Sequence, residues 1–270
     1  MADPNLVLVG CGNMGVALLR GWLHRGIAAD AIQVVEPGEP QATRARDLGV
    51  RVVESADALD PGRAPDAIVL AVKPQVMEAA ASAYAGHAGR AVFLSIAAGR
   101  TIASFEKLFG AAAAIVRTMP NTPGAIGRGI TVACPNAAVT DAHRILCDGL
   151  LQAMGEVAWL EDEALMDAVT AVSGSGPAYV FLLAESMRDA GIAAGLPEDL
   201  ADRLARHTVA GAGALILESG EDPARLREQV TSPGGTTAAA LEVLRSEGAM
   251  PDLLRDAIAA SARRSRELAG

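Results

Sequence analysis

Apolar and polar positions along the chain divide it into two parts with different periodicities. In the first part, short apolar runs bounded by glycine or polar residues alternate with segments of helical spacing. The runs predict strands at Leu6–Val9, Ile32–Val35, Val50–Val53, Ala67–Val72, Val92–Ile96, Ile115–Thr118 and Ile130–Cys134. The spacing predicts helices at Met14–Arg25, Gln41–Leu48, Ile102–Phe109 and Asp141–Met154. This alternation predicts a mostly parallel, doubly wound sheet of the Rossmann type.

The strand signals end at about Glu161, and the rest of the chain has helical spacing only. Helices are predicted at Ala164–Val172, Ala178–Ala194, Glu198–Leu217, Ala224–Val230, Thr236–Ser246 and Pro251–Leu268. Gly195, Gly220 and Gly248 fall where three of these helices end, as is typical of helix C-termini. We therefore expect two domains in the 270 residues, an α/β domain over 1–161 and an all-helical domain over 162–270.

Composition and charge narrow the class of protein. A formal charge of −9 argues against a non-specific nucleic-acid binder and against a surface that docks on acidic membranes. The longest charge-free run, Ala168–Ala184, is interrupted by Ser173–Pro177 and is too short to span a bilayer. No signal peptide is visible, and three cysteines and four histidines without ligand spacing predict no metal site. We expect a cytoplasmic protein.

The first strand runs into a glycine-rich segment of the dinucleotide-binding type. Gly10-Cys11-Gly12-Asn13-Met14-Gly15 matches G-x-G-x-x-G between a predicted strand and a predicted helix. The glycines permit a tight turn and close approach to a pyrophosphate, and the helix N-terminus offers free N–H groups. Ordinary turn glycines are the alternative. The expected cofactor contacts here are Gly10, Cys11, Gly12, Asn13 and Met14.

Glu36 ends the next strand, 21 residues beyond Gly15. A carboxylate at this position accepts hydrogen bonds from ribose hydroxyls and repels a 2′-phosphate, which favours NADH over NADPH. Arg44 and Arg46 follow closely and are able to turn toward a phosphate. The alternative for both arginines is a solvated helix face.

Four further segments are rich in glycine, proline, serine and threonine. They are Ala71-Val72-Lys73-Pro74, Met119–Pro123, Ser173–Tyr179 and Thr231–Thr237. Together with the glycine-rich turn, in this order, they resemble the pyrroline-5-carboxylate reductase family, from Leu6 to about Leu268. The resemblance implies NAD(P)H-dependent reduction of Δ1-pyrroline-5-carboxylate to L-proline, the last step of proline synthesis. It also implies a helical dimerisation domain similar to the C-terminal domain of 6-phosphogluconate dehydrogenase.

The resemblance assigns the nicotinamide end of the cofactor to loops that follow predicted strands. Val72, Lys73 and Pro74, with Ala97 and Ala98, are expected to flank the nicotinamide and its ribose. A solvated strand end is the alternative for Lys73. Asn121, in the rigid Met119–Pro123 segment, is expected to hydrogen-bond either cofactor or backbone, and the sequence leaves both possibilities open.

The segment Thr231–Thr237 is the expected substrate site. Pro233-Gly234-Gly235 interrupts the chain before a helix opens at Thr236, so free N–H groups there suit a carboxylate. A simple threonine cap is the alternative. By resemblance the loop holds the substrate carboxylate, with Thr237 placing its hydroxyl at the substrate nitrogen. The expected substrate contacts are Glu163, Ser232, Gly234, Gly235, Thr236 and Thr237, and for Glu163 a helix-start charge is the alternative.

The residues also bear on competing activities. Carbonyl reduction requires a positioned proton donor, yet residues 162–270 contain no lysine and a single histidine, His207. This counts against hydroxyacid and phosphogluconate dehydrogenases, whereas a protonated C=N bond is already electrophilic and needs mainly positioning. Another cyclic-imine or hydroxyacid reductase and a non-enzymatic nicotinamide sensor remain the alternatives.

Two positions depart from the family pattern. Glu36 stands where NADPH-using members commonly have a small serine-type residue, and Ala56 where an asparagine is frequent. The expected assembly is a homodimer with intertwined helical domains, or a larger ring of dimers. Each active site would then lie between one subunit's nucleotide domain and the partner's helices.

Overall fold

The structure is a computed structural model, and it describes residues 3–269. The described chain forms two compact units. The first unit consists of two segments, the chain up to Gly174 and the chain from Ala262 onward. The second unit is Ser175–Ser261.

The first unit is built on one sheet, which contains eight strands within the described residues. The strands are β1 (Leu6–Val9), β2 (Ile32–Val35), β3 (Arg51–Val53), β4 (Ala67–Leu70), β5 (Val92–Ser95), β6 (Ala114–Met119), β7 (Gly129–Pro135) and β8 (Gly155–Trp159). Their order is β3-β2-β1-β4-β5-β6-β7-β8, and all neighbours are parallel except β6 and β7. The order reverses between β1 and β4, where open α/β sheets bind ligands at the carboxyl ends of the strands.

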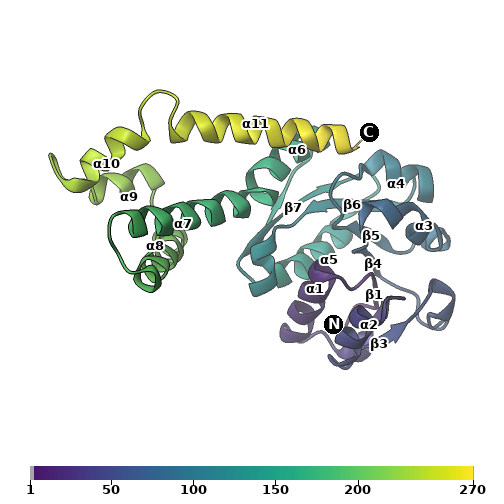
Figure 1. Cartoon of the computed structure of the whole chain (residues 1–270). Coiled ribbons are helices and arrows are strands. Elements are labelled where there is room, and N and C mark those ends of the chain that lie inside the picture. Colours follow the sequence, from purple (N-terminus) through teal and green to yellow (C-terminus); the bar gives the residue numbers. More distant parts are fainter. Residues whose placement is uncertain (1–2, 270) are drawn as a thin grey trace. The chain divides into compact units, whose positions relative to one another are not determined.

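Helices cover both faces of this sheet, because its central strands are apolar on both faces (Figure 1). One face packs on α1 (Asn13–His24), α2 (Glu39–Arg46) and α5 (Asp141–Leu151). The other packs on α3 (Met77–Ser82), α4 (Ile102–Phe109) and α6 (Met166–Val169). Along β1, Leu6 and Leu8 face the first group while Val7 and Val9 face the second.

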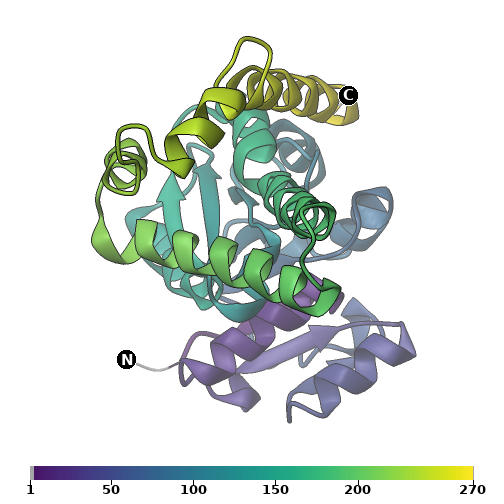
Figure 2. The same ribbon diagram turned by 60° about the vertical axis from the view of Figure 1, so that its left-hand side comes forward.

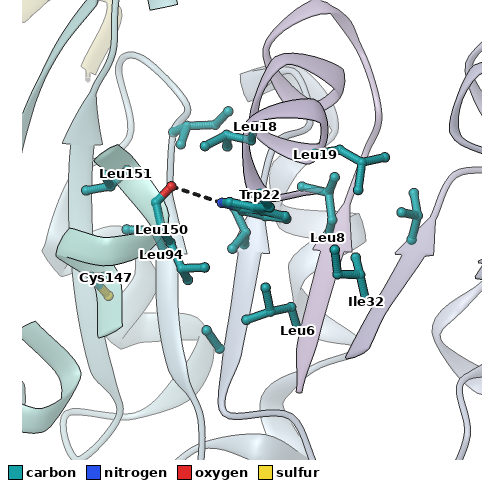
Figure 3. Close-up of a cluster of buried hydrophobic side chains, with 14 of the residues drawn as sticks. Leu6, Leu8, Leu18, Leu19, Trp22, Ile32, Leu94, Cys147, Leu150 and Leu151 are labelled. Atoms are coloured by element: carbon teal, nitrogen blue, oxygen red, sulfur yellow. Dashed lines mark hydrogen bonds between the residues drawn. The ribbon is translucent and has the colours of Figure 1, made fainter. Parts of the chain in front are cut away.

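The α1 face is centred on Trp22, which is fully buried (Figure 3). Its indole Nε1 donates a hydrogen bond to the backbone oxygen of Leu150 at 2.9 Å. This bond satisfies the polar atom of a buried ring and joins α1 to the end of α5. The bond holds the last turn of α1, the helix that follows the glycine-rich turn, against α5.

The second unit contains helices and no strand within the described residues (Figure 2). They are α7 (Gly176–Ala193), α8 (Glu198–Ser219), α9 (Pro223–Gln229), α10 (Thr236–Leu244) and α11 (Met250–Ala269), the last of which continues into the first unit. Ser175 and Ser261 place their hydroxyl oxygens 3.0 Å apart, which ties the start of α7 to α11.

Much of the apolar surface of this helical unit is exposed. Phe181 is 65% exposed, Leu217 72% and Val243 71%, while Ala201 and Ala205 are its buried apolar residues among those described. Exposed apolar residues gathered on helices are typical of surfaces that bind a protein, a membrane or a ligand.

The fold class predicted from sequence is confirmed: a mostly parallel Rossmann-type sheet is followed by an all-helical domain. The short elements α3 and β8 were not predicted. Strands end at Trp159, near the expected boundary, although the compact units divide at Gly174 and Ser261. The difference arises because Met166 packs under the sheet and Ser265 donates to Asp167 at 2.6 Å. None of the described helices is long and apolar enough to cross a membrane.

Candidate active site

The glycine-rich turn leaves no room for side chains at two of its three glycines. Gly10 has φ +87°, and a Cβ there would lie 2.7 Å from Cγ1 of Val72. A Cβ on Gly15 would lie 2.5 Å from the backbone oxygen of Gly10. Because both positions lack a side chain, α1 is able to pack closely against the ends of β1 and β4. Gly12 differs, because a Cβ there would meet nothing within 4 Å and would project into open space.

The N-terminus of α1 offers unpaired donors at this turn. Gly12 is the N-cap and no side chain caps the helix. The first helical bond runs from the N–H of Val16 to the oxygen of Gly12, so within residues 3–269 the N–H groups of Asn13, Met14 and Gly15 have no acceptor. Free N–H groups with the positive end of the helix dipole form an anion seat.

Glu36 lies beside this seat and is held by two backbone donors. Its Oε2 accepts the N–H of Cys11 at 2.7 Å and its Oε1 accepts the N–H of Gly38 at 2.8 Å. The N–H of Cys11 is therefore directed at Glu36. Burial, and then the charge of Glu36, raise the pKa of the Cys11 thiol to about 11, so the thiol stays neutral.

The two arginines of α2 lie in different environments. Arg46 pairs with Glu39 at 3.0 Å on the surface. The Nε of Arg44 is buried, and no described residue accepts a hydrogen bond from it.

A cavity of about 600 Å³ opens at the carboxyl ends of β1, β2, β3 and β4. It brings together five of the residues predicted to bind cofactor: Gly10, Gly12, Glu36, Val72 and Lys73. Ala56, the departure from the family pattern, also lines it. Sequence analysis missed Glu54, Ser55 and Tyr84, which share this lining. Glu54 and Ser55 were within reach of prediction, since they follow β3 and parallel strands end at one edge.

The remaining predicted cofactor residues lie at the same edge of the sheet, beyond the lining of this cavity. Pro74 begins a 3-10 turn, Pro74–Val76, after β4, while Ala97 and Ala98 follow β5. Asn121 follows β6, and its Oδ1 accepts the N–H of Ile130 at 3.1 Å. Of the two possibilities left open for Asn121, a bond to backbone is present in the structure.

Glu163 is hydrogen-bonded to a buried arginine. Its Oε1 accepts from Nη1 of Arg117 at 2.7 Å and from the N–H of Ile102, at the start of α4, at 2.8 Å. The Arg117 side chain is 7% exposed and that of Glu163 27%. The carboxylate thus compensates a buried charge and accepts one N–H at the start of α4, whose N-cap is Thr101. Contact with substrate stays a prediction for Glu163.

The predicted substrate loop lies within the helical unit. Gly234 has φ +68°, and the N–H of Gly235 donates to the oxygen of Ser232 at 3.0 Å, closing a tight turn. A Cβ on Gly235 would lie 2.7 Å from Oγ of Ser232. The turn therefore favours glycine at both positions, directly before α10 begins.

No side chain caps α10, so the simple threonine cap considered above is absent. Gly235 is the N-cap, and the first helical bond runs from Ala239 to Gly235. In the described chain, the N–H groups of Thr236, Thr237 and Ala238 have no acceptor. Thr237 is half-buried. This end of α10 is able to receive a carboxylate, with the Thr237 hydroxyl nearby.

The nucleotide-binding half fits a dinucleotide on three observations of this chain. The unpaired N–H groups of α1 suit a pyrophosphate. The open space above Gly12 is a cradle that a side chain would fill. The fixed carboxylate of Glu36 suits ribose hydroxyls.

Known proteins match over the full length of the chain. A family model described as pyrroline-5-carboxylate reductase dimerisation matches residues 163–268, and one described as NADP oxidoreductase, coenzyme F420-dependent, matches residues 5–99. A pyrroline-5-carboxylate reductase of Pseudomonas aeruginosa is 42% identical, covering 100% of this chain and 98% of that relative. A solved reductase structure from Coxiella burnetii has a TM-score of 0.92 at 32% identity and covers 99% of both chains. One from Plasmodium falciparum with NADP bound has a TM-score of 0.85 at 29% identity and covers 100% of both.

Proposed function

The chain belongs to the pyrroline-5-carboxylate reductase family, and on that premise we propose how its residues reduce Δ1-pyrroline-5-carboxylate to L-proline. The protein is an NAD(P)H-dependent oxidoreductase acting on a C=N bond. One observation carries this function: the sequence is similar to pyrroline-5-carboxylate reductases over both its nucleotide-binding part and its helical part. The other enzymatic and non-enzymatic alternatives raised by the sequence lack such support.

The dinucleotide is proposed to bind across the carboxyl ends of the parallel strands. The N–H groups of Asn13 and Met14 hold its pyrophosphate over Gly12, and Glu36 accepts ribose hydroxyls. Lys73 and Pro74, with Ala97, Ala98 and Asn121, flank the nicotinamide end. When bound, the reduced nicotinamide supplies the hydride that adds to C5 of the ring.

NADH is the proposed preferred cofactor. Two carboxylates, Glu36 and Glu54, line the cavity, and Lys73 is the cationic side chain among its described lining residues. A 2′-phosphate beside Glu36 would meet a fixed negative charge, whereas ribose hydroxyls would meet an acceptor. The chain's own residues therefore favour a cofactor without that phosphate.

The substrate is proposed to bind at the start of α10. The free N–H groups of Thr236 and Thr237, next to the turn formed by Ser232, Gly234 and Gly235, hold its carboxylate, and Glu163 lies near the substrate. The Thr237 hydroxyl hydrogen-bonds the ring nitrogen and fixes the orientation of the C=N bond. A protonated imine is already electrophilic, so orientation and exclusion of water are sufficient roles for the protein.

A homodimer is the proposed minimal assembly, with larger rings of dimers built from it. The chain carries a dimerisation domain, and the exposed apolar faces of α7 and α8 require a covering surface. Each active site would combine one subunit's nucleotide domain with the partner's helices. We infer a cytoplasmic location, because the three cysteines are buried and free.

A panel of imines tests this function. Purified protein with reduced cofactor is expected to convert Δ1-pyrroline-5-carboxylate to proline, identified by chromatography. Activity on other cyclic imines or on hydroxyacids, with none on pyrroline-5-carboxylate, would contradict it.

A further inference from the structure

Tyr84 follows α3 and contributes to the wall of the cavity described above. The wall on this side is otherwise made of small apolar residues: Val76, Ala79, Ala80 and Ala83. A phenol is therefore the polar group that the α3 side presents to this space. Tyr84 is 1% exposed, and its ring packs in the core layer under α3 and α4.

The hydroxyl of Tyr84 has no hydrogen-bond partner among residues 3–269. The hydroxyl oxygen is nevertheless not fully enclosed by protein atoms. The small accessible part of Tyr84 is therefore at the hydroxyl. Since Tyr84 lines the cavity, its O–H is directed at that space. A phenylalanine would fill the same hydrophobic position without burying a polar group, so packing alone does not account for the hydroxyl.

The position of the cavity in the sheet identifies which part of a dinucleotide reaches Tyr84. The cavity lies over the ends of β3, β2, β1 and β4, on the Glu36 side of the glycine-rich turn. Of the loops proposed for the nicotinamide end, the one after β4 borders this cavity at Val72 and Lys73, and those after β5 and β6 lie on the side away from Glu36. The adenosine half is therefore the part next to α3.

We propose that the Tyr84 hydroxyl hydrogen-bonds the adenosine half of the cofactor and is a binding determinant within the Rossmann cavity. This rests on the proposed binding of a dinucleotide. The alanines beside it leave flat apolar space for a purine ring, whose edge carries both donors and acceptors. Burial raises the pKa of Tyr84 above its usual range, so the phenol keeps its proton and is able both to donate and to accept.

The test measures binding of ADP-ribose to the full-length protein by isothermal titration calorimetry, which needs neither substrate nor turnover. Tyr84→Phe keeps the ring and removes the hydroxyl, and it is expected to weaken ADP-ribose and NADH alike, about threefold to tenfold. Binding of nicotinamide mononucleotide is expected to stay unchanged. Ser82→Ala is the matched control, because Ser82 is on α3, its hydroxyl bonds the backbone oxygen of Ala79, and Ser82 itself does not line the cavity.

Outcomes for this inference and for the proposed function differ. If the wild-type protein fails to bind ADP-ribose, the proposed dinucleotide site is wrong and this inference falls with it. If the wild type binds and Tyr84→Phe binds equally well, water satisfies the hydroxyl and this inference alone is overturned. Tyr84→Leu, which also lacks the hydroxyl, is expected to lose a similar factor, and wild-type affinity in either folded variant would contradict the proposal.

Discussion

The carboxylate of Glu36 accepts the backbone N–H of Cys11 at 2.7 Å, so the end of β2 is tied to the turn between β1 and α1. The same carboxylate accepts the N–H of Gly38. These two backbone hydrogen bonds fix the negative charge of Glu36 in the lining of the cavity. A carboxylate without them would be able to rotate away from a phosphate. Glu36 is thus a structural tie with a fixed position, and the proposed preference for NADH rests on its charge.

Glu36→Gln is expected to raise the ratio of kcat/KM for NADPH to that for NADH by about tenfold or more, because it removes the charge facing a 2′-phosphate. Steady-state kinetics with both cofactors measures the ratio. Glu39→Gln is the control, since Glu39 pairs with Arg46 and does not line the cavity. An unchanged ratio in Glu36→Gln would show that this carboxylate does not set the preference.

Thr237→Val keeps the shape of the side chain and removes the hydroxyl proposed to meet the ring nitrogen. Turnover is expected to fall about tenfold to a hundredfold, the range for a hydrogen bond to a charged group. Cofactor affinity, followed by fluorescence titration, should stay near wild type, and Thr237→Ser should recover most of the activity. Loss of cofactor binding in Thr237→Val would refute the assigned role.

Glu163→Ala is expected to lower the free energy of unfolding by about 3 kcal/mol, because it leaves Arg117 buried without its partner and the N–H of Ile102 without its acceptor. Urea unfolding at fixed protein concentration measures this. Glu161→Ala is the control, since Glu161 pairs with Arg144 and is 75% exposed. A large rise in substrate KM without loss of stability would instead favour the substrate contact predicted from the family.

Phe181→Glu tests the apolar face of the helical unit. The side chain is 65% exposed in one chain, so a charge there is tolerable unless a partner covers it. We expect the dissociation constant of the dimer, measured by analytical ultracentrifugation, to rise about thirtyfold or more. Activity is expected to fall as the dimer dissociates. Ile145→Glu, at a position 75% exposed on α5, is expected to stay dimeric.

A wild-type protein that sediments as a monomer with its activity retained would contradict the proposed dimer. A fragment of residues 162–270 that folds as a stable monomer would contradict the view that this domain depends on a partner.

The native protein is expected to resist thiol reagents. Burial raises the pKa of Cys11 to about 11 and that of Cys147 to about 12, so at pH 8 the Cys11 thiolate is about one part in a thousand. Above pH 9 these thiols ionise in the unfolded chain but not in the folded one. Stability should therefore fall as pH rises from about 9 toward 11.

Titration with a chromogenic disulfide checks the thiol prediction. No rapid reaction is expected from the native protein, and three thiols should react after denaturation. Fast labelling of Cys11 in the native state would contradict the burial at the glycine-rich turn.

The sheet could be predicted from the sequence because its strands are short apolar runs ended by glycine or polar residues. Leu6–Val9 and Ile32–Val35 were predicted to the residue. β8 was missed because Gly155–Trp159 mixes a charge with apolar residues and gains its strand character from pairing with β7. α3 is six residues long, too short for a helical period to be visible.

The candidate site divides in the same manner. The glycine-rich turn and the Thr231–Thr237 segment follow local rules of turns and helix ends, so their local structure could be predicted from the sequence, as could the place of Glu36 after a strand, while their binding roles stay predictions. The Glu163–Arg117 pair joins positions 46 residues apart, and the contact between Tyr84 and the cavity depends on how α3 packs. Tertiary contacts of this kind leave no local pattern.

The central claim is tested most directly by following the oxidation of NADH and of NADPH, in parallel, as Δ1-pyrroline-5-carboxylate is added to the full-length protein. We predict cofactor oxidation that requires the substrate, one L-proline formed for each cofactor consumed, and a higher kcat/KM with NADH. No substrate-dependent oxidation with either cofactor would contradict the assigned function, and a clear preference for NADPH would contradict the role given to Glu36.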